Sequence, residues 1–565
     1  MTRQTGWRPA KLATIMVLAV SMLLGSCVRR ELRIVPPDAA ARTTAALRAR
    51  IDTIVVIYAE NRSFDNLFGK FPGAEGVSAM IDANGEPTAA YVPQRDRDGS
   101  VLAELPKTWE GVTAQGVQPA VTEQQSAGLP NAPFAIETGF FRHSPVRLGS
   151  DVVTRDLYHR FFENQMQIGS GGNEGFAAWS DAGGLTMGHY GAHHSALIEL
   201  AKRYTLADHF FQGAFGGSFL NHQYLICACA PEYPQANTSP AKPRITALER
   251  DAQGRALPRL ALAATSPRSA LQGPPKYVSS SSIAPADYFG DGRFHAINTM
   301  QPPYQPSAAP PARDDVSLAH ADPLLPVTLP AQTAATVGDQ LDSRGVSWAW
   351  YAGAWNSAVA DGRQPADVPR KVIYTPSTPA GAPDFQPHHQ PFNYYAAFDP
   401  IAHADARATH LKDYEDLVSD AERGRLPQVV FYKPQGNLNQ HPGYASIADG
   451  DVHIAELVAR LAKSPQWPRM LIVITYDEFG GFWDHLRPPH GDLLGPGTRI
   501  PAIIVSPVAR RGHVDHTPYD TGSVLRLIGR RFDLPKLPGL AQRDAALAAH
   551  GEPPMGDLTE ALRLP

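Results

Sequence analysis

Two pairs of neighbouring polar residues have the chemistry to bind a divalent cation. Asp477 and Glu478 follow directly after a short apolar run, and Glu60 and Asn61 stand just after another. Adjacent carboxylates repel each other unless a positive charge lies beside them, and Ca²⁺, Mg²⁺ and Mn²⁺ prefer oxygen ligands. We therefore expect the two pairs to lie together around one metal ion. For Asp477 and Glu478 taken alone, the start of a solvated loop is the alternative.

A Gly-Gly-Ser turn at residues 216–218 could expose a nucleophile. Glycines allow tight backbone conformations, so the hydroxyl of Ser218 and several backbone N–H groups can face one ligand. Asn221 follows shortly after. The same pattern also fits an ordinary turn in which Ser218 caps a helix, because serine is a common N-cap residue. The local sequence leaves both interpretations open.

Histidines occur at three further places of interest. His159 lies within residues 154–167, whose spacing predicts a helix, and a single histidine on a helix is usually structural. His388 and His389 are adjacent on a proline-bounded loop, and His441 lies in the polar loop 437–442. Adjacent histidines on a loop can both point into a cleft, although such pairs are also common on surfaces.

The elements that carry these residues alternate between strand and helix. Short apolar runs rich in β-branched residues predict strands at 53–58, 346–351, 428–432, 471–476 and 500–506. Helical spacing occurs at 154–167, 195–203, 452–462 and 522–529. Strand 428–432, helix 452–462 and strand 471–476 form a parallel crossover unit. We therefore expect an α/β fold with a central, mostly parallel sheet flanked by helices, whose ligands lie beyond the carboxyl ends of the strands.

Composition and charge limit the classes of function. The chain has 565 residues, 43% of them hydrophobic, which is enough for one large core. The net charge of -4 gives no reason to expect binding to nucleic acid. High proline and glycine contents indicate long loops, and residues 232–335 are expected to be a loop-rich insertion that wraps over the core or forms a lid without chemistry of its own. We expect one catalytic domain at 51–535 and a C-terminal tail at 536–565.

The N-terminus has the pattern of an export signal. Basic residues precede the apolar run 12–24, as in secretory signals, and Leu-Gly-Ser-Cys at 24–27 ends that run like a bacterial lipoprotein site. Cys27 is therefore predicted to become a lipidated membrane anchor, with residues 28–50 as a linker. An ordinary signal peptide or an uncleaved anchor is the alternative. In each case we expect an exported protein, whether periplasmic, anchored in the outer membrane or secreted.

Two further cysteines, Cys227 and Cys229, are separated by one residue. Neither strand nor helix geometry easily joins two cysteines at this spacing, so we expect both to be small buried core residues. A disulfide or a metal role is the alternative, although no further thiol supports it.

Four motifs together resemble the bacterial phosphoesterase family of acid phosphatase A and phospholipase C type enzymes. They are Glu-Asn-Arg-Ser-Phe-Asp at 60–65, Gly-Gly-Ser-Phe-Leu-Asn-His at 216–222, Thr-Tyr-Asp-Glu-Phe-Gly-Gly at 475–481 and Arg-Ile-Pro-Ala-Ile-Ile-Val-Ser at 499–506. The resemblance covers about residues 50 to 535 and implies an alkaline-phosphatase-like fold. It also implies a metal site formed by Glu60, Asn61, Ser218, Asp477 and Glu478, with Ser218 as the nucleophile.

The same resemblance assigns roles on the phosphate side. It implies that His441 protonates the leaving group and that the phosphate is bound by His159, Asn221, His388 and His389. Where the phospholipase branch has Thr-x-Pro-Asn, this chain has Ser-Phe-Leu-Asn at 218–221. That form, and the sequence His-His-Gln-Pro-Phe-Asn at 388–393, are closer to the acid phosphatase branch.

The chemistry of these groups agrees with that resemblance. Three carboxylates, an amide and a hydroxyl form a hard oxygen site, and a cation beside Ser218 would lower the pKa of its hydroxyl. Because imidazole titrates near pH 6.5, protonated histidines would favour activity on the acid side of neutrality. We therefore expect an exported, metal-dependent acid phosphatase that hydrolyses phosphomonoesters through a phosphoserine. A phospholipase C that cleaves phosphodiester headgroups is the first alternative, and a non-catalytic surface lipoprotein is the second. Metal identity and oligomeric state stay open.

Overall fold

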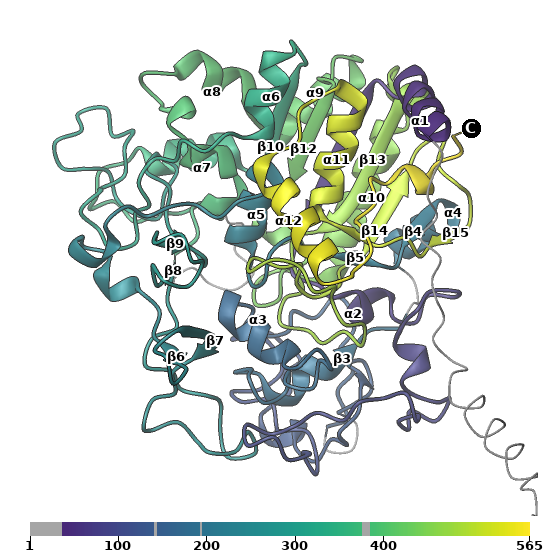
Figure 1. Ribbon diagram of the computed structural model, residues 1–565, viewed down its shortest axis with the longest axis vertical. Coiled ribbons are helices and arrows are strands. Elements are labelled where there is room, and N and C mark those ends of the chain that lie inside the picture. Colours follow the sequence, from purple (N-terminus) through teal and green to yellow (C-terminus); the bar gives the residue numbers. More distant parts are fainter. Residues whose placement is uncertain (1–36, 141–143, 192–194, 376–384, 565) are drawn as a thin grey trace, which may run out of the picture. The chain divides into compact units, whose positions relative to one another are not determined.

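The computed structural model describes residues 37–140, 144–191, 195–375 and 385–564 (Figure 1). The predicted signal segment and Cys27 lie outside these ranges. The chain divides into residues 1–41 and a compact unit, 42–565, which holds the central sheet and every candidate site residue. Part of the expected linker is helical, because the Ala- and Arg-rich segment Pro37–Arg50 forms α1. Within the described ranges, no helix is long and apolar enough to cross a membrane.

An eight-stranded sheet forms the centre of the compact unit. Its order is β11 (Leu411–Asp413), β10 (Trp348–Ala352), β12 (Val429–Lys433), β1 (Thr53–Ala59), β13 (Met470–Tyr476), β14 (Ala502–Val505), β4 (Thr205–Ala207) and β15 (His513–Asp515). Neighbouring strands are parallel except that β14 runs antiparallel to both β13 and β4. The predicted α/β class and mostly parallel sheet are confirmed.

The two central strands carry the acidic residues to one edge of the sheet. Every residue of β1 and β13 is buried, as expected for strands covered on both faces. Their register pairs Thr53 with Met470 and Ala59 with Tyr476, so the two strands end level. Glu60 and Asp477, the next residues along the chain, therefore begin at the same carboxyl edge of the sheet.

The helices that cover the sheet form two groups, and the helices of one group contact one another. One group holds α5 (Ser218–Cys227) and α11 (Thr521–Phe532), and the other holds α10 (Ile447–Leu461) with α4 (Ala196–Arg203) and α9 (Tyr414–Glu422). In Figure 1, α11 and α12 lie in front of the sheet. The remaining helices are α2 (Phe64–Phe68), α3 (Phe161–Ile168), α6 (Val337–Ser343), α7 (Trp355–Gly362), α8 (Ala404–His410) and α12 (Pro538–Ala549).

Short elements complete the unit. The paired two-stranded segments are β2 (Phe134–Ala135) with β3 (Gly188–His189), β5 (Phe210–Phe211) with β16 (Tyr519–Asp520), β6 (Leu248–Arg250) with β7 (Ala256–Leu260), and β8 (Ile283–Ala284) with β9 (His295–Ala296). Single 3-10 turns occur at Val77–Ala79, Gln124–Ser126, Gly183–Met187, Ala236–Thr238, Lys242–Arg244, Pro387–His389, Pro391–Tyr394, Ala396–Phe398, Gly436–Leu438, Trp467–Arg469 and Thr559–Ala561.

Two local predictions are wrong. The helix expected at 154–167 begins only at Phe161, because Arg160 has an extended N-cap conformation, and His159 therefore lies before the helix. Cys227 and Cys229 form a disulfide. The left-handed backbone of Ala228 ends α5 between them, and this turn directs the two side chains toward each other, with the Cα atoms 5.1 Å apart.

Candidate metal and phosphate site

Four of the five predicted metal-binding residues meet at the carboxyl edge of β1 and β13. Glu60, Asn61, Asp477 and Glu478 are fully buried, and the backbone N–H of Asn61 donates to Asp477 Oδ1 at 3.0 Å. Asn61 has a φ of +61°, which asparagine tolerates better than most residues. A Cβ atom at Gly480 would lie 2.1 Å from the Asn61 carbonyl oxygen, so this close approach of the two loops requires glycine.

Ser218 lies among these groups at the start of α5. Its Oγ is 3.1 Å from Asn61 Oδ1 and 3.4 Å from both Glu60 Oε2 and Glu478 Oε1. The N-cap of α5 is Gly217, so the interpretation of Ser218 as a cap is wrong. The first turn of a ten-residue helix also presents unpaired N–H groups and a partial positive charge, which favour an anion at this position.

Asn221 supports the turn that presents Ser218. Its Oδ1 accepts from the N–H of Ala214, and its Nδ2 donates to the carbonyls of Ala214, Gly216 and Gly217. The side chain is fully buried and its hydrogen-bonding groups are occupied by the backbone. This arrangement contradicts the predicted contact between Asn221 and phosphate.

The predicted histidines surround the carboxylates. His389 Nε2 lies 2.5 Å from Glu60 Oε1, His441 Nε2 lies 3.7 Å from Glu60 Oε2, and His159 Nε2 lies 3.7 Å from Glu478 Oε1. Each of His159 and His441 pairs its Nδ1 with a backbone carbonyl, of Leu157 and Pro442 respectively. With a proton on Nδ1, their Nε2 atoms face the site as lone-pair donors.

Two residues with no predicted role complete the cluster. Lys433 is fully buried at the end of β12, with Nζ 2.8 Å from Glu60 Oε1 and 3.6 Å from Asp477 Oδ2. His222 is also fully buried, stacks on His389, and has Nδ1 3.8 Å from Asp477 Oδ2. For Lys433 the sequence held a usable signal, because a third parallel strand ends in a charged residue beside β1. For His222 the signal was its position one helical turn after Ser218.

The buried charges are unbalanced without a cation. Burial opposes ionisation of Glu60, but Lys433 and His389 hold the pKa of Glu60 well below its usual range. Burial, reinforced by Glu60, raises the pKa of Asp477 to about 7, and burial together with Asp477 raises the pKa of Glu478 well above its ordinary value. Asp477 Oδ2 accepts no hydrogen bond from the described residues. This set of carboxylate, amide and hydroxyl oxygens therefore fits a divalent cation, with imidazole nitrogens also within reach.

The pKa values of the site histidines are shifted away from the protonated form that we expected. Burial lowers the pKa of His159, His389 and His441, and burial lowers that of His388 well below its usual range. Neutral imidazoles at the pH of the cytoplasm or periplasm follow from these shifts. The direction of these pKa shifts is opposite to the one that protonated histidines beside the phosphate would need.

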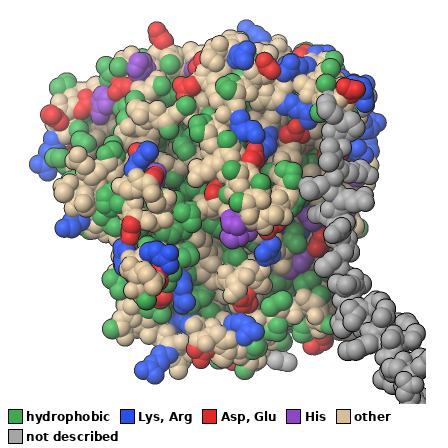
Figure 2. Space-filling view, in the orientation of Figure 1, with side chains coloured by type: hydrophobic (Ala, Val, Ile, Leu, Met, Phe, Trp, Pro, Cys, Tyr) green, Lys and Arg blue, Asp and Glu red, His purple; other side chains and the backbone are tan. Residues whose placement is uncertain are grey.

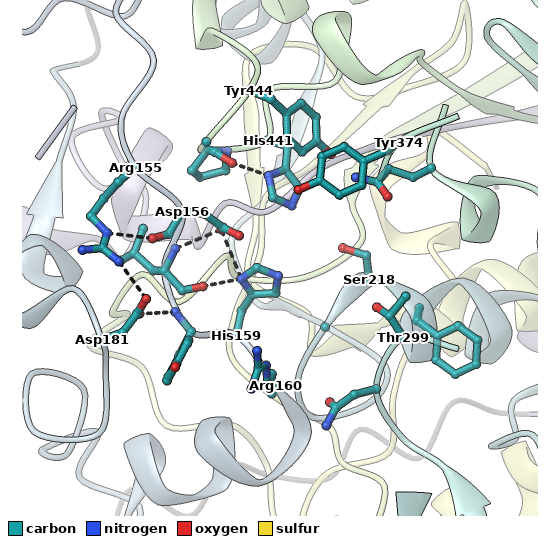
Figure 3. A pocket seen from close by; sticks show the side chains of 18 of the residues that line it. Arg155, Asp156, His159, Arg160, Asp181, Ser218, Thr299, Tyr374, His441 and Tyr444 are labelled. Carbon is teal, nitrogen blue, oxygen red and sulfur yellow. Dashed lines mark hydrogen bonds and ion pairs between the residues drawn. The ribbon is translucent and has the colours of Figure 1, made fainter. Parts of the chain in front are cut away.

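The site opens into a large cavity (Figure 3). The cavity has a volume of about 1520 Å³, and Ser218, His159, His388 and His441 line it. Figure 3 shows the rings of His159 and His441 beside the space in front of the Ser218 hydroxyl. Other lining residues include Leu157, Arg155, Arg160, Asp181, Phe219, Tyr374 and Tyr444.

The insertion 232–335 forms one wall of this cavity. Arg244, Asn298, Thr299 and Gln301 line it, and Asn298 Oδ1 accepts from the N–H of Phe161 at 3.0 Å. The insertion therefore borders the space that a substrate would enter, in keeping with a segment that wraps over the core. On the face shown in Figure 2, acidic and basic side chains are interspersed among the described residues.

Comparison with curated proteins finds phospholipases C. The chain is 32% identical over 158 residues to phospholipase C B of Mycobacterium tuberculosis, 31% over 146 residues to non-specific phospholipase C6 of Arabidopsis thaliana, and 28% over 149 residues to hemolytic phospholipase C of Pseudomonas aeruginosa. These matches cover 23%, 20% and 22% of this chain and 30%, 28% and 20% of the relatives. The matched part is thus less than a third of each relative's length.

Among solved structures, the chain is similar to a phosphonate monoester hydrolase from Silicibacter pomeroyi, with 24% identity, a TM-score of 0.14, and coverage of 19% of this chain and 22% of that one. It is also similar to a sulfatase from Pseudoalteromonas sp., with 13% identity, a TM-score of 0.26, and coverage of 66% and 72%. The model of the phosphoesterase family matches residues 51–535, which include every candidate site residue described above. The chain therefore belongs to the phosphoesterase family.

Proposed function

We propose that this phosphoesterase is metal-dependent and that Ser218 is its nucleophile. The observation that carries the proposal is the position of the Ser218 hydroxyl, which lies within 3.4 Å of Glu60, Asn61 and Glu478 and borders the cavity. When bound between these residues, a divalent cation would lower the pKa of the hydroxyl and reduce the charge of an approaching phosphate.

Each residue of the site has a separate role in this reaction. Ser218 Oγ forms a bond to phosphorus while the bond from phosphorus to the ester oxygen breaks, which leaves a phosphoserine. The N–H groups at the start of α5 bind phosphate oxygens, and Asn221 holds the turn that aims them. The neutral His441 takes the Ser218 hydroxyl proton on Nε2 and gives it to the departing oxygen. It later takes a proton from the attacking water and returns it to Ser218 Oγ as phosphate leaves. His159 and His388 border the phosphate from the cavity side.

For the substrate we propose a phosphodiester of the phospholipid class, cleaved as a phospholipase C does. The names of the curated relatives support this choice over the phosphomonoester predicted first. The cavity also has room for alcohol groups on both sides of phosphorus, and its wall combines apolar and aromatic side chains with charged ones. Phosphomonoester hydrolysis remains the second candidate, because the Gly-Gly-Ser form at 216–218 resembles the acid phosphatase branch more than the phospholipase branch.

The substrate proposal is tested by comparing three compounds with one enzyme preparation. Phosphate or headgroup release is measured from a chromogenic phosphomonoester, a phosphocholine diester and phosphatidylcholine vesicles between pH 5 and 8, with Ser218→Ala as the blank. A diester preference in kcat/KM supports phospholipase C activity. A monoester preference supports the second candidate. Turnover no higher than the blank on all three would instead favour the non-catalytic lipoprotein.

We also propose that the protein is exported. The Cys227–Cys229 disulfide supports export, because disulfides persist mainly in oxidising compartments. The basic and apolar N-terminal pattern that ends at Cys27 supports a signal sequence of the lipoprotein type. Fractionation of cells that express the parent and Cys27→Ser tests both points. Release of Cys27→Ser from membranes supports the lipid anchor, and unchanged membrane partitioning contradicts it.

A further inference from the structure

A second group of ligand-type side chains lies at the ends of two other parallel strands. β4 and β15 are paired so that Ala207 is level with Asp515. Asp208 and His209 follow β4, and His516 follows β15, so all three begin at the same edge of the sheet as Asp477. Glu75 joins them from the loop after α2, at residues 69–76. We name these four residues, Glu75, Asp208, His209 and His516, the sheet-edge cluster.

The geometry of the sheet-edge cluster suits a small cation. One ligand atom each of Asp208, His209 and His516 lie within 4.8 Å of one another. His516 Nδ1 is 2.9 Å from both carboxylate oxygens of Asp208, and His209 Nε2 is 2.9 Å from Glu75 Oε2. The Asp208 side chain is fully buried, whereas that of His516 is 53% exposed. The cluster thus has a fixed inner ligand and an entry path from solvent.

The backbone of the cluster is held in place by a buried arginine. Arg499 Nη1 donates to the carbonyls of Glu75 and Asp208, at 2.6 and 2.9 Å, and its Nε is 2.9 Å from Asp484 Oδ1. The N–H of Glu75 also donates to Asp208 Oδ2 at 2.8 Å. Two chain segments that are far apart in sequence are therefore fixed relative to each other before any ion binds, which reduces the ordering cost of binding.

We propose that the sheet-edge cluster is a second metal site, separate from the catalytic cluster, and that it takes a first-row transition ion such as Zn²⁺. Two imidazoles with two carboxylates form a nitrogen and oxygen set that suits Zn²⁺, in contrast to the oxygen-rich site around Ser218. β4 is two strand positions from β13, so the two sites are roughly 10 Å or more apart at about 4.8 Å per strand.

The competing explanation is a pair of simple histidine–carboxylate ion pairs. The number of Zn²⁺ ions bound per chain after dialysis distinguishes the metal site from simple ion pairs. It is measured for the parent, His516→Ala and His209→Gln. The control is His550→Ala, which removes another surface histidine, one that stacks on His490. We expect both cluster variants to bind one Zn²⁺ less than the parent and the control. The Zn²⁺-induced rise in melting temperature should shrink in the same two variants.

Because neither His209 nor His516 lines the catalytic cavity, both variants should keep hydrolytic activity within twofold of the parent when the catalytic metal is in excess. The proposal is overturned if His516→Ala and His209→Gln bind as many Zn²⁺ ions as the parent. It is also overturned if His550→Ala loses the same equivalent, since the ion would then be held by surface histidines in general. Melting temperatures without Zn²⁺ show whether each variant is folded. If His516→Ala does not fold, His209→Gln still tests the proposal.

Discussion

Lys433 Nζ lies 2.8 Å from Glu60 Oε1, and both side chains are completely buried. β12 and β1 are adjacent parallel strands; Lys433 is the last residue of β12 and Glu60 follows β1, so both lie at the carboxyl edge of the sheet. The pair neutralises one of the three buried carboxylates, so the charges of Asp477 and Glu478 remain for a metal ion to balance. Lys433 therefore sets the amount of negative charge that a bound cation has to balance.

Replacing Lys433 with methionine should destabilise the protein when no metal is bound. The change leaves Glu60 buried without its strongest partner, and losing one member of a buried ion pair costs about 3–5 kcal/mol. Added divalent cation should recover part of the lost stability. Denaturant unfolding with and without metal measures both effects. Lys202→Met removes an exposed pair with Glu199 and should change the free energy of unfolding by less than about 1 kcal/mol. Equal losses in both variants would show that Lys433 has no special place in the charge balance.

Gly480→Ala should disturb the metal site through Asn61. The new Cβ would lie 2.1 Å from the Asn61 carbonyl oxygen, so one of the two loops must move. We expect hydrolysis to fall at least about 100-fold, as when one electrostatic stabiliser is lost. The matched control is Gly85→Ala, which also has a positive φ but meets no atom within 4 Å. It should lose only about 1–2 kcal/mol of stability and keep its activity. Similar activity in both variants would contradict the tight fit at Gly480.

Asn221→Ala should reduce stability and activity together. The variant leaves the N–H of Ala214 unpaired, and a buried unpaired group costs about 1–3 kcal/mol. The carbonyls of Gly216 and Gly217 each lose one hydrogen bond but keep the Gln212 amide and the backbone N–H of position 221 as partners. Thermal unfolding and kcat measured on the same sample test this expectation. Asn84→Ala, in an exposed turn, should leave both unchanged. If Asn221→Ala instead raises KM at an unchanged melting temperature, Asn221 contacts the phosphate as first predicted.

Chelation should abolish hydrolysis and lower the melting temperature. Without a cation, the Asp477 and Glu478 carboxylates repel each other or take up protons, and a ligand at 100 times its Kd adds about 2.7 kcal/mol to stability. Readdition of Ca²⁺, Mg²⁺, Mn²⁺ or Zn²⁺ one at a time identifies the ion that restores turnover. Full activity in a sample shown by elemental analysis to be free of metal would rule out a metal-dependent mechanism.

The convergence of the acidic pairs could be predicted because it depends on local sequence and one general rule. β1 and β13 are apolar on both faces, and parallel strands in one sheet end at the same edge. The end of a strand indicates where Lys433 lies, but its ion pair with Glu60 and the role of Asn221 could not be predicted in the same way. They depend on which atoms a folded turn or a neighbouring strand places within hydrogen-bond distance, and periodicity does not encode those distances.

Other differences have similar physical causes. The start of α3 depends on the extended conformation of Arg160, which spacing alone does not reveal. The Cys227–Cys229 disulfide depends on the single left-handed residue Ala228. The insertion 232–335 has weak periodicity, yet Asn298 fixes it to the start of α3 and makes it a wall of the cavity. In each case a tertiary contact or one backbone angle decides the outcome.

The turnover rate of Ser218→Ala, measured beside its melting temperature, decides whether Ser218 is the nucleophile. Ser218 makes no capping hydrogen bond, so its loss should shift the melting temperature little. Loss of a group that forms a covalent intermediate should reduce kcat by at least about 1000-fold. If Ser218→Ala instead keeps kcat within tenfold of the parent, water attacks phosphorus directly and the phosphoserine mechanism is wrong.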